Sequence, residues 1–132
     1  MDKIELKKRT KKFAVDIIVF LSPLPYNKGT DVISKQLLRS ATSVGANYRC
    51  ACRGKSTADF INKIIIVEEE ADESVYWLEL LEETNLVQSE LIDPLKKEAN
   101  ELTAIFTSIG RTSKFNQLNS NPKSNIRNPK SA

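Results

Sequence analysis

Carboxylate side chains are the most concentrated chemical groups in this sequence. Residues 68–73 carry five of them, Glu68, Glu69, Glu70, Asp72 and Glu73. Their oxygens are ligands that a hard cation prefers. Successive residues of a helix point to different faces, however, so we expect a solvated or ion-paired surface rather than a metal site.

Other residues that support catalysis are few. The chain has no histidine, the commonest general base, and its four glycines are scattered rather than gathered in a phosphate-binding loop. Cys50 and Cys52 would diverge by about 200° on a helix, which disfavours a disulfide between them, and two thiols fall short of a structural zinc site. We expect two thiols that are at least half-buried, no catalytic residues, no metal and no cofactor, so the chain is not expected to be an enzyme.

Basic side chains of the segment 30–53 are the strongest candidates for a functional surface. On a helix their positions fall on one side, opposite the apolar positions, and a further lysine follows in the next turn. The candidates are Lys35, Arg39, Arg49, Arg53 and Lys55. Such a stripe can follow a phosphate backbone, whereas Tyr26 and Tyr48 are too few to indicate base stacking. The alternative is that these arginines pair with acidic residues of the following helix.

Charge is divided into blocks along the chain. Residues 1–55 carry twelve Lys and Arg against four Asp and Glu, and residues 56–110 carry three against thirteen. Residues 111–132 carry five basic residues and no acidic ones. The charged start is unlike a signal peptide, and no apolar run approaches the roughly 18 residues that span a bilayer. These features predict a cytoplasmic protein with no membrane partner.

Apolar periodicity predicts an all-α domain over residues 1–112, with helices at 3–21, 30–53, 57–87 and 93–110. Gly54 is placed to end the second helix in a left-handed conformation, and Gly110 to end the fourth. Pro94 suits the first position of a helix that begins near Asp93, whereas the alternative start at Ser89 and Glu90 would place the proline where it costs a hydrogen bond. Gly45 predicts a close approach by a neighbouring helix. Residues 113–132 are expected to form a disordered basic tail.

The third predicted helix is apolar on more than one side. Beyond its main stripe, which begins at Phe60, it carries Ile65, Ile66, Tyr76, Trp77 and Leu80. A helix with two apolar sides needs two partners. We expect the second partner to be another copy of the chain, so these five residues are candidates for a homo-oligomer interface.

The run QLLRSATSVGANYRCACRGKSTADFINK and the later segments 69–81 and 102–109 resemble a known family. It is the bacterial four-helix-bundle family also called the 23S rRNA intervening-sequence protein family. The resemblance implies an antiparallel up-down-up-down four-helix bundle that assembles as a ring-like homo-oligomer, a pentamer. The accessory proteins of diversity-generating retroelements have a similar bundle, and they are associated with RNA and a reverse transcriptase.

These observations favour a non-catalytic oligomeric accessory protein that binds nucleic acid, RNA more than DNA, through the basic surface of the second helix. The alternative is a protein scaffold whose ring docks a partner enzyme, such as a reverse transcriptase, without touching nucleic acid. Exposed side chains at Arg39, Arg49 and Arg53 would support the first hypothesis, and ion pairs to the third helix would support the second.

Overall fold

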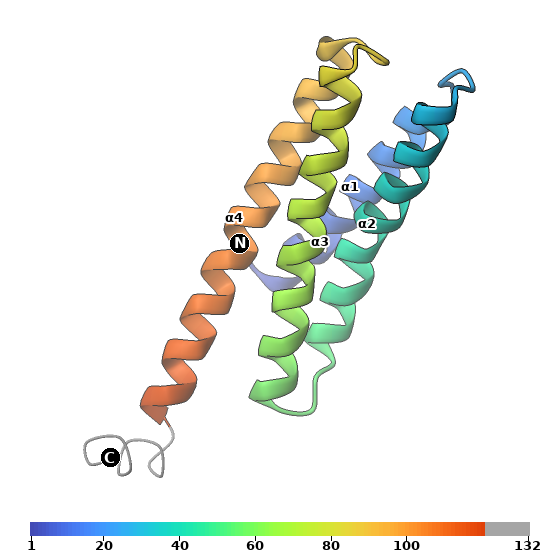
Figure 1. Cartoon of the computed structure of the whole chain (residues 1–132). Helices are drawn as coiled ribbons and strands as arrows, with labels where there is room; N and C mark the ends of the chain where they lie inside the picture. The colour runs from blue at the N-terminus through green and yellow to red at the C-terminus, as the bar shows by residue number, and fades with distance from the viewer. Residues whose placement is uncertain (121–132) are drawn as a thin grey trace.

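The computed structural model describes residues 1–120, which form four helices. They are α1 (Lys3–Leu21), α2 (Lys28–Cys52), α3 (Thr57–Glu83) and α4 (Ser89–Ser120). Consecutive helices run in opposite directions, which confirms the expected up-down-up-down bundle (Figure 1). α3 packs against α2 and α4, whereas α1 packs against α2 and, less extensively, against α4.

Polar side chains begin three of these helices. The Asp2 carboxylate accepts a hydrogen bond from the backbone N–H of Glu5 at 2.8 Å, and the Glu5 carboxylate accepts one from the N–H of Asp2. The Asn27 side chain accepts from two N–H groups in the first turn of α2, and the Ser56 hydroxyl accepts from the N–H of Asp59 in α3. Each cap supplies a partner to amides that have none within the helix, so local sequence fixes these three starts.

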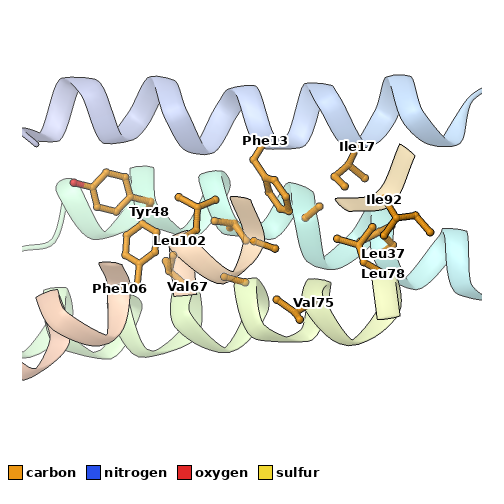
Figure 2. Close-up of a cluster of buried hydrophobic side chains, with 14 of the residues drawn as sticks. Phe13, Ile17, Leu37, Tyr48, Val67, Val75, Leu78, Ile92, Leu102 and Phe106 are labelled. Carbon is orange, nitrogen blue, oxygen red and sulfur yellow. The ribbon is translucent and has the colours of Figure 1, made fainter. Parts of the chain in front are cut away.

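The core lies between all four helices (Figure 2). Each helix contributes side chains that are almost completely buried, among them Phe13 and Ile17 of α1, Leu37 and Tyr48 of α2, Val67 and Leu78 of α3, and Leu102 and Phe106 of α4. The rings of Tyr48 and Phe106 pack with their centroids 5.3 Å apart. Burial is the main cause that raises the pKa of the Tyr48 phenol, and a hydrogen bond with Cys52 is the second.

Small residues let α1 and α2 approach closely, as Gly45 predicts. A methyl group at Gly45 would lie 3.4 Å from the backbone carbonyl carbon and oxygen of Thr10. This distance confirms the expected close approach at Gly45. Between α2 and α3, the hydroxyl groups of Ser40 and Ser74 form a buried hydrogen bond, with 2.8 Å between the two oxygens.

The structure corrects the expected start of α2, the left-handed cap at Gly54 and the expected end of α3. α2 begins at Lys28 rather than at residue 30. Gly54 does not adopt a positive φ and so is not a left-handed cap, but α2 ends at Cys52 with Arg53 as its cap, one residue from the expected end. α3 ends at Glu83 rather than at residue 87, and Asn85 has a φ of 58°. Asparagine tolerates this left-handed conformation, so it reverses the chain between α3 and α4.

Both expected ends of α4 are also wrong. The helix begins at Ser89 rather than at residue 93, so Pro94 lies inside it. The hydrogen bond lost at the proline is offset because this extra turn buries Ile92 completely. Gly110 does not stop the helix. It is buried against α3, where a methyl group in its place would lie 3.6 Å from the Ile64 side chain.

The expected disordered tail is wrong for residues 113–120, which continue α4. Ser113 and Gln117 are half-buried and one helical turn apart, whereas Lys114, Phe115 and Leu118 are exposed. The remainder of that expected tail lies outside the described residues.

The five candidate interface residues do not behave alike. Tyr76 is 52% exposed, and its ring packs edge-on against that of Trp77 with the centroids 5.0 Å apart. Trp77 and Leu80 are half-buried against the core of their own chain. Ile65 and Ile66 are half-buried on α3. A second copy could still cover this surface, and its role in assembly stays a prediction.

Candidate nucleic-acid interface

The first half of the predicted basic stripe is occupied by ion pairs. The Lys35 ammonium lies 3.1 Å from the Asp31 carboxylate one turn earlier in α2. The Arg39 guanidinium donates hydrogen bonds to the carboxylates of Glu70, at 3.1 Å, and Glu73 in α3. These contacts raise the pKa of Arg39, chiefly through the Glu70 hydrogen bond. Arg39 therefore serves the packing of α2 on α3.

The second half of the stripe is free. Arg49 and Arg53 are exposed, and no ion pair among residues 1–120 involves either of them. Both line an open groove between α1 and α2, with a volume of about 530 Å³. Thr42, Gly45 and Ala46 of the same helix form part of its floor. Short side chains here keep the groove open between the two rows of longer ones.

α1 supplies the other wall of this groove. Lys7, Lys8 and Lys11 line it together with Ala14. We name the groove of these three lysines with Arg49 and Arg53 the basic groove. Its lining includes five cationic side chains and no acidic one. The sequence pattern of α2 identifies only two of the five, because the basic start of α1 reads as a solvated surface until its packing on α2 is known.

Lys55 lies in the turn between α2 and α3, away from the basic groove. It is exposed and lines two further hollows at the same end of the bundle. One, between α2 and α3, also includes Arg53 and Lys63. The other includes Lys3, whose ammonium lies 5.6 Å from the centre of the Phe60 ring. The expected site residues thus form two groups, with Lys35 and Arg39 engaged and the other three free of ion pairs among residues 1–120.

Folding converts the charge blocks of the sequence into two halves of the bundle. The half that contains the α2–α3 turn comprises residues 1–11, 46–63 and 108–120, and we call it the basic half. It holds eleven Lys and Arg against three Asp and Glu. The acidic half, residues 12–45 and 64–107, holds six against fourteen. A polyanion approaching the molecule would be attracted to the basic half.

In the acidic half, carboxylates are joined to cations on neighbouring helices. The Lys96 ammonium of α4 lies 2.5 Å from the Glu82 carboxylate of α3, and this hydrogen bond lowers the pKa of Glu82. Arg9, at the edge of the basic half, donates to Glu98 at 2.7 Å and Glu101 at 2.8 Å on α4. The Glu98 hydrogen bond is the largest cause that raises the pKa of Arg9.

Other kinds of site find little support in the described part of the chain. Among residues 1–120, histidine, cysteine and acidic side chains form no group of three that could hold a metal ion. None of the helices in this range combines the length and apolarity that a bilayer span requires. Cys50 and Cys52 are free thiols, and Cys50 is exposed, contrary to the expectation that both are at least half-buried.

Comparisons with known proteins agree with this architecture. A solved structure from Bacteroides thetaiotaomicron, described as a protein of unknown function from the S23 ribosomal protein family, is similar with a TM-score of 0.77. The two chains share 39% sequence identity over 84% of this chain and 99% of that one. No curated protein matches the chain. The family model for the 23S rRNA-intervening sequence protein matches residues 2–108, so the chain belongs to that family.

Proposed function

We propose that this chain is a non-catalytic accessory protein that binds nucleic acid, RNA in preference to DNA, through the basic groove. The observation that carries the proposal is the groove itself, where five cations from two helices face solvent without an acidic neighbour in the lining. Keeping like charges together is unfavourable unless an anion shares the site. The family's description, which refers to 23S rRNA, favours RNA as that anion.

Phosphate groups are the part of RNA that such a groove can contact. Its lining has no aromatic side chain on which bases could stack. Binding should therefore depend on counterion release, with an affinity that falls as salt rises and with little preference for sequence. The side chains bind and orient the strand, and the proposal assigns no chemical step to them.

The experiment is a salt titration of a fluorescein-labelled oligouridylate RNA, followed by fluorescence anisotropy. The double variant Arg49→Ala, Arg53→Ala should bind about tenfold more weakly and should lower the slope of log affinity against log salt by about 1.4, since each single-strand phosphate contact contributes about 0.7. Lys28→Ala with Lys97→Ala removes the same charge from exposed positions outside the groove and should change neither quantity. An unchanged slope in the arginine variant would contradict the proposal.

Self-association is a second part of the proposal. A ring of copies, a pentamer by resemblance, would present several basic grooves together, and linked weak sites bind a long strand more tightly than one site does. The exposed Tyr76 and the half-buried Ile65 are the surface that we assign to this contact, whereas Ile66 also lines the hollow between α2 and α3 and is left out of it. Light scattering should give a multiple of the 14.9 kDa chain mass, and a monomer at all concentrations would contradict a ring.

A protein partner is the second candidate, favoured by a specific surface. Val15 and Val19 of α1 are 48% and 65% exposed, on the side of that helix away from the core. Neighbouring exposed aliphatic side chains are suited to protein contacts. Under this alternative the assembly is a scaffold that docks an enzyme, such as a reverse transcriptase, without nucleic acid. A partner that is retained after nuclease treatment and lost in Val15→Ser, Val19→Ser would support it.

A further inference from the structure

A second hollow lies next to the basic groove and shares one lining residue with it. This second hollow lies between the end of α2 and the start of α3 and has a volume of about 520 Å³. Arg53 lines both, so its side chain lies between the two hollows. Lys55 and Lys63 extend the positive charge into the second hollow, where Asp59 is the single acidic lining residue.

The two hollows face different directions. α2 packs against both α1 and α3 (Figure 1). Residues of α1 and α2 line the basic groove, whereas residues of α2 and α3 line the second hollow, so a ligand that fills both must turn around α2. Double-stranded nucleic acid resists bending on this scale, with a persistence length of about 150 base pairs for DNA. A straight duplex can therefore rest on one face only. A single strand can change direction within a few nucleotides.

We propose that the RNA bound by this protein is single-stranded and bends around α2 at Arg53, running from the basic groove into the hollow that contains Lys63. This inference rests on the proposed function and adds the form of the ligand and its path. The cations of both hollows face the phosphates, and neither hollow is lined by an aromatic side chain on which the bases could stack.

Length dependence follows from this path. The lining residues of α2 in the basic groove, Thr42 to Arg53, span roughly 16 Å at 1.5 Å per residue. At about 3.4 Å per stacked nucleotide, that groove holds at most about five nucleotides. A strand of about fifteen nucleotides would fill both hollows. Lys63 should therefore matter only to the longer strand.

The test measures the affinity of single-stranded oligouridylates of about five and about fifteen nucleotides and of a duplex of the longer length. We expect Lys63→Ala to weaken the longer strand several-fold, to lower its salt slope by about 0.7, and to leave the shorter strand unchanged. Asp59→Asn removes the acidic neighbour and should strengthen the longer strand about twofold. Lys97→Ala on α4 is the matched control, and circular dichroism verifies the fold of each variant.

The outcomes distinguish a failure of the proposed function from a failure of the bent single-stranded path. If the Arg49→Ala, Arg53→Ala variant binds every RNA as the unmodified protein does, the proposed function itself fails. If that variant weakens binding but Lys63→Ala leaves the affinity for the longer strand unchanged and Asp59→Asn does not strengthen it, the basic groove binds RNA and the bent single-stranded path is overturned. The same conclusion follows if the duplex binds as tightly as the single strand of equal length.

Discussion

The two halves of the bundle use the same kinds of charged residue in different ways. In the acidic half, Arg39 and Lys96 lie between helices and are joined to carboxylates of α3. In the basic half, Arg49 and Arg53 lie on the same helix as Arg39 but face a groove without acidic residues. Side chains of one sequence stripe thus hold helices together at Arg39 and remain available for a ligand at Arg49 and Arg53.

What separates them is the neighbouring helix. α3 faces Arg39 with Glu70 and Glu73, whereas α1 faces Arg49 with lysines. An arginine between two helices is stabilised when the opposite helix supplies an acid, and it is left for solvent or for an external anion when that helix supplies a base. The helix that lies opposite, rather than residue type, therefore decides which arginines are functional candidates.

Replacing Arg39 should lower the stability of the fold more than the other substitutions predicted below. Arg39→Ala removes two ion pairs and leaves Glu70, whose side chain is only 18% exposed, without its cation. We expect the free energy of unfolding to fall by about 1 kcal/mol, measured by urea denaturation, with little change in RNA affinity. Arg49→Ala should weaken RNA binding and leave the free energy of unfolding nearly unchanged. A large loss of RNA binding in Arg39→Ala at unchanged stability would contradict this division of roles.

A smaller effect is the pH dependence of the Lys96–Glu82 pair. Because the folded protein lowers the pKa of Glu82, the pair stabilises the fold above the usual glutamate pKa of about 4.3, and this contribution is lost as the pH falls through the lower folded value. The difference in Tm between the unmodified protein and Lys96→Met should therefore be present at about pH 6 and shrink as the pH falls below the usual glutamate pKa of about 4.3.

The neighbouring Lys97 offers a control for that measurement. It is exposed and takes part in no ion pair among residues 1–120. Lys97→Met should leave Tm nearly equal to that of the unmodified protein at both ends of that pH range. A difference between Lys96→Met and the unmodified protein that stays constant with pH would show that lost packing, and not the ion pair, is responsible.

Much of the fold could be predicted from the sequence because the relevant signals are local. The span of α1 and the start of α3 follow from apolar spacing and from capping residues within a few positions. The ends of α4 could not, because burial of Ile92 and the contact of Gly110 with Ile64 are tertiary. Local rules for proline and glycine predict a stop at these positions, and packing overrides them.

The site was predictable only in part for a similar reason. The periodicity of α2 places Arg49 and Arg53 on one side of the helix, which the structure shows to border the basic groove. It gives no information about which helix lies opposite. Whether α2 meets the lysines of α1 or the acids of α3 depends on how the helices pack, and that separates Arg39 from the other two.

The most direct test of the account is to locate bound RNA on the bundle. An oligouridylate that contains 4-thiouridine is photocrosslinked to the full chain, and the modified peptides are identified by mass spectrometry. We predict crosslinks in residues 1–11 and 46–63, which belong to the basic half, and none in residues 64–107. Crosslinks concentrated in the acidic half, or spread evenly over both, would contradict the claim that the free cations of α1 and α2 form the nucleic-acid interface.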